Sequence, residues 1–178
     1  MGLSSFHLRS AAPADMAAIT EIYGHHVLAG LASYEEVPPS KAEMITRHAA
    51  IIERGLPYVV AETEGVVAAY AYAGPFRTRS AYRYTVEDSV YVSERFARQG
   101  LGKTLIHELI NRCTDKGFRQ MVAVIGGGHP ASIALHLACG FHEAGRLTDT
   151  GFKKGQWLDT VFMQRSLGVG SKAPPQNR

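Results

Sequence analysis

The residue types best suited to chemistry are gathered in one turn that follows an apolar, strand-like run. The run and turn comprise Val90, Tyr91 and Val92 and then Arg98, Gln99, Gly100, Leu101, Gly102 and Lys103. The first N–H groups of a helix have no partner within the helix, and they suit a phosphate together with the positive end of the helix dipole. Gly100 and Gly102 would let phosphate oxygens approach the backbone, and Arg98 and Lys103 would add positive charge. The pattern predicts a pyrophosphate-binding turn, with a strand-to-helix turn that binds nothing as the alternative; its spacing fits neither GxxxxGK[ST] nor GxGxxG.

A second cluster, of arginine and aromatic residues, precedes the same strand. Phe76, Arg77, Arg79 and Arg83 lie within eight residues of one another. The planar guanidinium group of arginine pairs bidentately with a carboxylate, phosphinate or sulfone oxygen. The cluster therefore predicts a site for a small anionic group, although solvated surface arginines would give the same sequence.

The elements that must position these residues follow from hydrophobic periodicity and from helix and turn signals. We expect strands at residues 6–9, 85–92, 121–125, 141–147 and 158–164, a hairpin at 58–73, and helices at 13–30, 40–55, 102–113 and 130–140. Ser40 and Glu43 have the spacing of a capping box. This order predicts one α+β domain around a mixed sheet over residues 1–167, with residues 168–178 as a disordered tail.

Composition excludes several classes of protein. The formal net charge of +3 comes from scattered Lys and Arg residues, which does not favour nucleic acid as a partner. No apolar run approaches the roughly 20 residues of a membrane helix, and residues 1–9 do not have the pattern of a signal peptide, so we expect a cytoplasmic protein. The two cysteines, Cys113 and Cys139, and the pair His25-His26 have no metal-ligand spacing, and no metal is predicted.

The turn and four further segments resemble a known family. Residues 95–102, Arg-Phe-Ala-Arg-Gln-Gly-Leu-Gly, resemble the [QR]xxGx[GA] acyl-CoA turn of the GCN5-related N-acetyltransferases (GNAT), with Ala97 departing from the first position. Residues 131–141, which end in Gly-Phe, resemble the final motif of that superfamily. Residues 82–92, 122–126 and 151–159 resemble the phosphinothricin and methionine sulfoximine N-acetyltransferases in particular. The resemblance spans residues 8–167 and implies the GNAT-type, mostly antiparallel sheet flanked by helices.

The resemblance also implies a chemistry, the transfer of acetyl from acetyl-CoA to the amine of a small amino-acid-like substrate. Glu87, in the Thr-Val-Glu segment, matches the position to which the family's general base is assigned, and strand alternation places it on the face opposite Val86 and Asp88. A solvated strand carboxylate is the alternative for Glu87, and Asp88 is expected to be structural or exposed. His136 stands where many members carry a tyrosine that protonates the leaving thiolate; it is either that acid or a packed helix residue.

The remaining site residues are implied by position within the same motifs. The backbone N–H groups of residues 90–92 would form an oxyanion hole, and Ser132 would contact coenzyme A. Phe76, Arg77, Arg79, Thr85 and Val124 would line the substrate site with Glu87, and the loop that carries Tyr34 and Glu36 would close over it. Family resemblance further implies a homodimer with contributions from the C-terminal strands.

Two other functions remain compatible with the sequence. Acetylation of a protein N-terminus or lysine would require an open groove, and a peptide substrate panel would reveal it. The other is a non-catalytic acyl-CoA sensor, but the presence of Glu87 argues against it.

Overall fold

A seven-stranded sheet runs through the computed structural model, which describes residues 6–175. The strand order is β1-β2-β3-β4-β5-β7-β6, and every neighbouring pair is antiparallel except β4 and β5, which are parallel. The strands are β1 (His7–Ser10), β2 (Tyr58–Thr63), β3 (Val66–Pro75), β4 (Thr85–Val92), β5 (Gln120–Gly126), β6 (His142–Lys153) and β7 (Gln156–Ser166). The predicted α+β fold with a mixed, mostly antiparallel sheet is confirmed.

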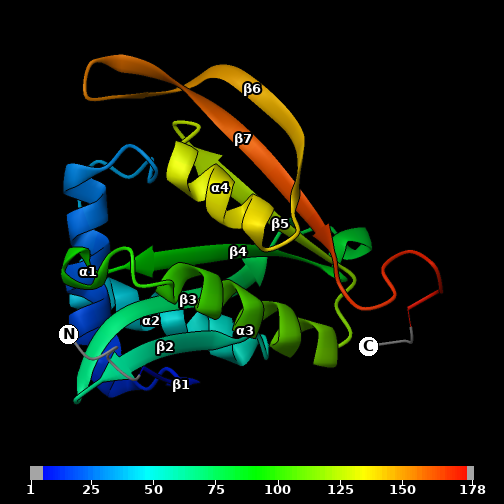
Figure 1. Ribbon diagram of the computed structural model, residues 1–178, viewed down its shortest axis with the longest axis horizontal. Coiled ribbons are helices and arrows are strands. Elements are labelled where there is room, and N and C mark those ends of the chain that lie inside the picture. The colour runs from blue at the N-terminus through cyan, green and yellow to red at the C-terminus, as the bar shows by residue number, and fades with distance from the viewer. Residues whose placement is uncertain (1–5, 176–178) are drawn as a thin grey trace.

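Helices cover both faces of the sheet (Figure 1). On one face lie α1 (Met16–Ala29) and α2 (Lys41–Glu53), and on the other lie α3 (Leu101–Asp115) and α4 (Pro130–Ala138). Single 3₁₀ turns occur at Pro13–Asp15, Ser80–Tyr82 and Glu94–Phe96. Among residues 6–175, no helix combines the length and apolar character that a membrane crossing needs.

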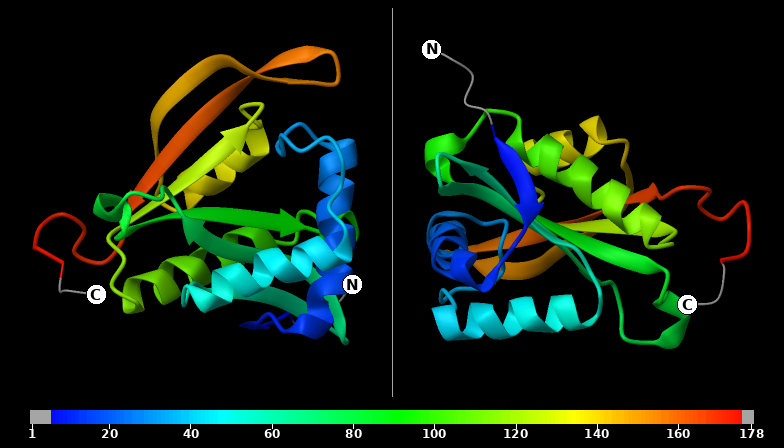
Figure 2. Two further views of the ribbon diagram at one scale, coloured as in Figure 1. Left: turned by 180° about the vertical axis from the view of Figure 1, so that it is seen from behind. Right: turned by 90° about the horizontal axis from the view of Figure 1, so that it is seen from below.

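The two faces of the sheet differ in the size of their side chains. Small residues of β2 and β3, such as Ala61, Ala69 and Ala71, face α3 and let that helix lie close to the sheet. The alternate residues are large aromatics, among them Tyr58 and Tyr70, which face α1 and α2. Strand alternation therefore produces one aliphatic core and one tyrosine-rich layer; Figure 2 shows the helices on the two sides.

The cap of α2 is only half of the predicted capping box. The Ser40 hydroxyl accepts a hydrogen bond from the Glu43 backbone N–H at 3.2 Å, as predicted. The Glu43 carboxylate does not complete the box, because it pairs with Arg47 one turn further along the helix. A charged partner on the same helix face thus replaces the backbone N–H of Ser40.

The sheet is split between its two parallel strands. β4 and β5 pair only over Thr85–Asp88 and Gln120–Ala123. Beyond that point β4 remains paired with β3 as far as Val92, while β5 remains paired with β7 as far as Gly126. The carboxyl-terminal halves of β4 and β5 therefore diverge and leave unpaired backbone on both sides of a gap.

The C-terminal hairpin is longer than predicted. Strands were expected at residues 141–147 and 158–164, but β6 continues to Lys153 and β7 begins at Gln156. Lys154 and Gly155 both have positive φ values, 51° and 75°, as the two-residue turn of a twisted hairpin requires. The added part of the hairpin extends past the rest of the sheet (Figure 1) and is mostly exposed, so its sequence has no apolar alternation.

The chain after β7 forms turns over residues 168–171 and a bend at 172–173, in which the N–H groups of Gly170 and Lys172 donate to the carbonyl oxygens of Leu167 and Val169. Residues 176–178 of the predicted disordered tail, and residues 1–5 of the segment tested for a signal peptide, lie outside the described residues.

Candidate active site

The gap between β4 and β5 presents backbone hydrogen-bonding groups from alternate residues of β4. Ser93 donates to Ala68 at 2.9 Å, so alternation places Tyr91 and Tyr70 in the next hydrogen-bonded pair of the β3–β4 ladder. The backbone groups of Val90 and Val92 therefore face away from β3 and into the gap. Of the three residues predicted to supply N–H donors here, geometry leaves Val90 and Val92, because the Tyr91 backbone is directed to β3.

One backbone acceptor in the gap is already engaged. The Val92 carbonyl oxygen lies 2.9 Å from His26 Nε2 on α1. A carbonyl can only accept, so Nε2 carries the hydrogen. Burial lowers the pKa of His26, which favours this neutral ring. His26 thus ties α1 to the end of β4.

Five of the residues predicted for the site meet around a small cavity of about 80 Å³ in this gap. They are Val90, Tyr91, Val124, Ser132 and His136. Ala32, from the loop after α1, completes the wall and was missed by sequence reasoning, because nothing in its local sequence indicates a contact with β5. The structure therefore brings residues from β4, β5, α4 and the α1–α2 loop to one place.

His136 is buried and has a partner for each ring nitrogen. Nδ1 lies 2.7 Å from the Ser132 carbonyl oxygen and Nε2 lies 3.0 Å from Asp88 Oδ2. Since a carbonyl and a carboxylate both accept, this arrangement suits a doubly protonated ring. Burial by itself lowers the pKa of His136, but the hydrogen bond and charge of Asp88 outweigh burial and raise it.

Asp88 was expected to be structural or exposed, and it is structural: only 1% of its side chain is accessible. The second oxygen of its carboxylate, Oδ1, is buried without a partner among residues 6–175. The sequence gives no sign of the pair with His136, since 48 positions separate the two residues.

The predicted phosphate turn lies at the start of α3. Gly100 precedes the first helical residue with a φ of 82°, in the left-handed region that favours glycine. Thr104 is the first residue whose N–H bonds back along the helix, to Gly100 at 3.1 Å. The N–H groups of Leu101, Gly102 and Lys103 are thus left without a partner inside α3.

The second glycine of the turn has a packing role in addition to the phosphate-binding role predicted for it, which stays a prediction. A Cβ at Gly102 would lie 3.0 Å from Leu135 Cδ2 of α4 and 3.9 Å from Val92 Cγ2. Gly102 therefore allows α3 to pack against α4, whereas a Cβ at Gly100 would meet nothing within 4 Å. The absence of a side chain matters for helix packing at position 102 and for backbone conformation at position 100. Leu101 is buried in the core, while Arg98, Gln99 and Lys103 are exposed.

Glu87 lies on the α1/α2 face of β4, opposite Asp88, as alternation predicts. Its partner on β3 is Gly74, which has no side chain, and the carboxylate is half-buried. Burial raises the pKa of Glu87, and the nearby Arg77 guanidinium offsets part of the increase. A half-buried carboxylate of raised pKa is the form in which glutamate serves as a base near neutral pH.

The other residues predicted to bind substrate fall into two hollows. Arg77 and Arg79 line a hollow of about 340 Å³ together with Arg83 and Arg54. Phe76 lines a second one, of about 260 Å³, with Val122 and Phe162. Thr85 lines both hollows.

The loop between α1 and α2 is fastened to the C-terminal hairpin. The Tyr34 hydroxyl lies 2.9 Å from the Asp159 carbonyl oxygen and 2.8 Å from Thr160 Oγ1. Its ring fills space that a Cβ on Gly126 or Gly151 would enter, at 2.8 Å in both cases. The loop is therefore held where Ala32 forms the wall of the gap.

A buried lysine reinforces this contact. Lys153 is 4% exposed, and its ammonium group donates to the carbonyl oxygens of Val27 and Ser33, both at 2.8 Å. Burial lowers the pKa of Lys153. Lys154 caps the same end of α1 through the Leu28 and Ala29 carbonyls. Sequence reasoning missed both roles, because a lysine in a hairpin turn is ordinarily solvated.

No group of three or more His, Cys, Asp or Glu side chains suited to a metal ion occurs among residues 6–175. The arrangement can instead bind an anion at the start of α3, a peptide-like chain along the free edge of β4, and a basic group at Glu87.

These features agree with the comparisons with known proteins. Residues 21–141 match the model of the acetyltransferase (GNAT) family, and the chain belongs to that family and is an acetyltransferase. A phosphinothricin N-acetyltransferase from Alcaligenes faecalis is 52% identical over 163 residues, covering 91% of this chain and 83% of the relative. An L-methionine sulfoximine/L-methionine sulfone acetyltransferase from Salmonella typhimurium is 40% identical over 160 residues, covering 90% and 94%.

A solved structure is similar over nearly the whole fold. It is a GNAT superfamily phosphinothricin acetyltransferase from Sinorhizobium meliloti in complex with acetyl-CoA, with a TM-score of 0.94 and 56% identity, covering 96% of this chain and 93% of that one. The resemblance to this branch of the family, drawn from the sequence motifs, is confirmed.

Proposed function

We propose that this acetyltransferase transfers acetyl from acetyl-CoA to the amine of a small amino-acid-like substrate, by direct attack within a ternary complex. The observation that carries the proposal is the position of Glu87. Its carboxylate lies on β4, the strand whose backbone N–H groups at Val90 and Val92 face the β4–β5 gap. A donor thioester in the gap and a base beside it are what an acetyl transfer to an amine requires.

The residues around the gap fit coenzyme A in kind and order. The free N–H groups at the start of α3, with Arg98, Gln99 and Lys103 nearby, suit the pyrophosphate. The free edge of β4 suits the pantetheine arm, because the amide groups of that arm can form the hydrogen bonds that a neighbouring strand would form. Ser132 on α4 lies across the gap. When bound, acetyl-CoA would supply an acyl group activated as a thioester.

Each step of the reaction then has a residue to carry it. Glu87 takes a proton from the substrate ammonium, and the free amine attacks the thioester carbonyl. N–H donors of Val90 and Val92 stabilise the negative oxygen that develops, a contribution of about 3–4 kcal/mol per donor in other enzymes. As the tetrahedral species collapses, the attacking nitrogen loses its second proton to water, and His136 donates its Nε2 proton to the leaving thiolate and regains one from solvent; for this the imidazole ring must turn from Asp88 toward the sulfur. The products are the N-acetyl compound and the free thiol of coenzyme A.

The acceptor that best fits the site carries an amine and at least one anionic group. Arg77 and Arg79 would hold the carboxylate or a tetrahedral group, with Phe76, Thr85 and Val124 on the walls. Phosphinothricin, methionine sulfoximine and methionine sulfone have this form, and the two curated relatives are named for such substrates.

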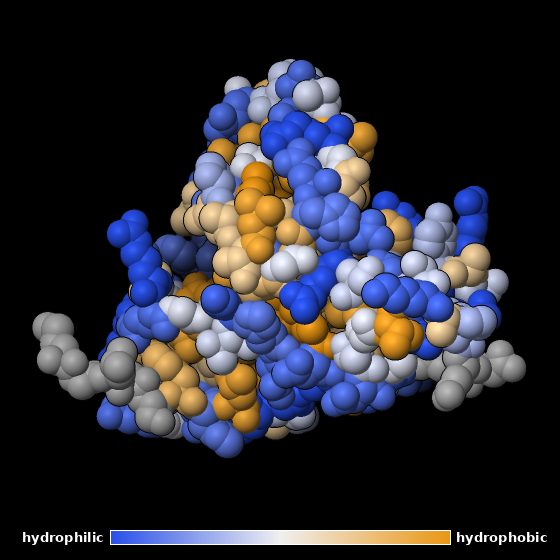
Figure 3. Space-filling model, turned by 45° about the vertical axis from the view of Figure 1, so that its right-hand side comes forward, coloured by the Kyte–Doolittle hydropathy of each residue, from blue (hydrophilic) through white to orange (hydrophobic). Residues whose placement is uncertain are grey.

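We further propose that the protein acts in the cytoplasm as a homodimer. Phe152 and Trp157, at the tip of the β6–β7 hairpin, are 58% and 63% exposed and pack edge to face, and Leu28 is 62% exposed. Figure 3 shows another face of the molecule, on which orange hydrophobic side chains also lie among blue hydrophilic ones. Replacing Phe152 and Trp157 together by serine should convert the dimer into a monomer in sedimentation experiments.

A thiol-release assay tests the proposed reaction directly. Acetyl-CoA would be incubated with the enzyme and phosphinothricin, methionine sulfone, methionine sulfoximine, free amino acids or short peptides. We expect release with one or more amino-acid-like compounds and none with peptides. Release with peptides alone would favour a protein acetyltransferase, and no release with any amine would contradict the proposal.

A further inference from the structure

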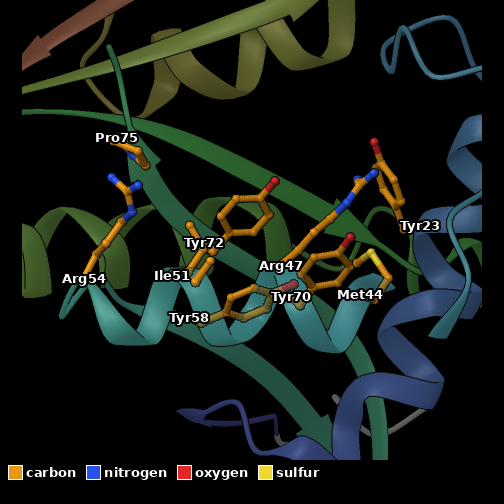
Figure 4. A pocket seen from close by; sticks show the side chains of 10 residues that line it. Tyr23, Met44, Arg47, Ile51, Arg54, Tyr58, Tyr70, Tyr72 and Pro75 are labelled. Carbon is orange, nitrogen blue, oxygen red and sulfur yellow. The ribbon is translucent and has the colours of Figure 1, made fainter. Parts of the chain in front are cut away.

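A pocket lined by tyrosines lies between α2 and the sheet, on the same face as Glu87. It encloses about 340 Å³, and its wall includes the rings of Tyr23, Tyr58, Tyr70 and Tyr72 (Figure 4). The rings of Tyr58 and Tyr72 stack with centroids 4.9 Å apart and planes inclined by 16°. This volume is within the range of small-molecule sites, which are mostly apolar with a few polar groups.

One polar atom of the wall has nothing to bind. Tyr70 is fully buried, and its hydroxyl has no hydrogen-bond partner among residues 6–175. Leaving a buried hydroxyl unsatisfied costs about 1–3 kcal/mol. Phenylalanine would fill the same volume without this cost, so the hydroxyl is best explained by a ligand atom that completes its hydrogen bond.

The two arginines at the rim of the pocket differ in their partners. Arg47 pairs with Glu35 at 2.7 Å and also with Glu43, so its charge is balanced. Arg54, at the other end of α2, forms no ion pair with any residue in the described part of the chain, and Figure 4 shows it beside Pro75. Arg54 and Pro75 also line the hollow that contains Arg77 and Arg79. The pocket therefore adjoins a region of unbalanced positive charge at one end only.

Strand register places Glu87 at this same end. Tyr70, Tyr72 and Gly74 alternate along one face of β3, and Gly74 is the partner of Glu87. A Cβ on Gly74 would lie 3.8 Å from Ile51 Cδ1, a residue of the pocket wall. The base, the free arginine and the tyrosine pocket thus lie around one glycine of β3.

We infer that the tyrosine pocket binds the side chain of the acceptor. An α-carboxylate in the hollow that Arg54 shares with Arg77 and Arg79, and an amine at Glu87, would direct the side chain across Gly74 onto the tyrosine rings. The pocket selects amino acids whose side chain is flat or long and apolar along its length, with a hydrogen-bonding atom at the end for Tyr70. L-Tyrosine has this form and L-alanine lacks it, while the buried apolar wall disfavours L-aspartate. The inference rests on the proposed function and adds a substrate class to it.

Two substitutions on α2 form a matched test. Ala50 lines the pocket and Ala49 does not, and both are exposed, so tryptophan should be tolerated at either position. Ala50→Trp should raise KM for L-tyrosine and L-phenylalanine at least tenfold and leave KM for acetyl-CoA and for L-alanine within twofold. Ala49→Trp should leave all four values unchanged.

A third variant examines the unpaired hydroxyl. The wild-type enzyme should prefer L-tyrosine to L-phenylalanine in kcat/KM, and Tyr70→Phe should abolish that preference without lowering the melting temperature. A merely structural Tyr70 would leave the preference unchanged.

The outcomes separate this inference from the proposed function. A wild-type enzyme that acetylates phosphinothricin but uses L-tyrosine no better than L-alanine would overturn the pocket assignment alone. Equal effects of Ala50→Trp and Ala49→Trp would do the same. A wild-type enzyme inactive on every amine would overturn the proposed function itself.

Discussion

The two sides of the proposed site are built in different ways. On the coenzyme side, the β4–β5 gap and the start of α3 offer backbone groups, left free because two parallel strands diverge and a helix begins. On the acceptor side, single side chains come from α2, β3, β4 and the loop of residues 76–84. A site made of backbone depends on local conformation, whereas a site made of side chains depends on packing between distant segments. Substitutions should therefore affect donor and acceptor binding separately.

The largest effect is expected at the residue where the two sides meet. Glu87→Gln should lower kcat by at least tenfold, and by up to roughly 10⁴-fold, because the base is lost. Affinity for acetyl-CoA should be unchanged, as measured by calorimetry. In the wild type, the rate should fall as pH drops through the raised pKa of Glu87, because only the ionised carboxylate accepts a proton.

The exposed Glu64, in the β2–β3 turn, provides the control. Glu64→Gln should have wild-type kinetics at every pH. Full activity of Glu87→Gln would remove Glu87 from the mechanism.

A pair of glycine substitutions tests whether conformation at the start of α3 serves the coenzyme side. Gly100 and Gly65 have φ values of 82° and 77°, and a Cβ on either would meet nothing within 4 Å. Alanine at each position should cost about 1–2 kcal/mol of unfolding free energy through backbone strain alone. Only Gly100→Ala should also raise KM for acetyl-CoA, by about tenfold, because it reorients the free N–H groups.

Steady-state kinetics and urea unfolding of the two variants would decide the matter. Equal KM values for acetyl-CoA in Gly100→Ala and Gly65→Ala would mean that the turn does not bind the coenzyme.

The position of the α1–α2 loop, which forms one wall of the gap, should depend on the buried Lys153 of the C-terminal hairpin. Lys153→Met removes both donors to the Val27 and Ser33 carbonyls and should lower the unfolding free energy by about 1–3 kcal/mol. Release of the loop should also raise KM for the acceptor a few-fold. The exposed Lys154 offers the comparison, and Lys154→Met should change stability by less than half as much in the same denaturation experiment. A larger effect at Lys154 would contradict the role assigned to Lys153.

The smallest expected effect is a pH dependence of stability from the Asp88–His136 pair. The pKa of His136 is raised in the folded protein, so the pair stabilises the fold fully below the unfolded value near 6.5, and this stabilisation is lost as pH rises through the folded value. Asp88→Asn lowers the folded pKa and should reduce the loss of stability between pH 6 and pH 9. The urea midpoints of the wild type and of Asp88→Asn at pH 6 and pH 9 would measure this change in stability. An equal change in the two proteins would argue against a charged pair.

The contrast between the two sides also explains what the sequence could predict. The turn of residues 98–103 and the strand carrying Glu87 are each contiguous in sequence, so their glycines, charges and alternation could be recognised from the sequence alone. Their resemblance to family motifs then indicated their function. The packing of Gly102 against α4 could not be predicted, because its neighbour Leu135 lies on another helix. The extent of β6 and β7 was underestimated, because an exposed hairpin has no apolar period.

Residues of the acceptor side were harder to find for the same reason. Arg54 and Tyr70 have ordinary local sequences, a helix end and a strand, and nothing marks them as neighbours of one pocket. Asp88 and His136 meet only because α4 packs over the end of the parallel pairing. Lys153 is buried by a loop more than a hundred residues away in the chain.

The central claim, that free backbone groups beside the divergence of β4 and β5 hold the acetyl donor, is tested most directly by titrating the wild-type protein with acetyl-CoA in a calorimeter. We predict saturable binding with one site per chain in the absence of any amine. The absence of binding at millimolar acetyl-CoA would contradict the account.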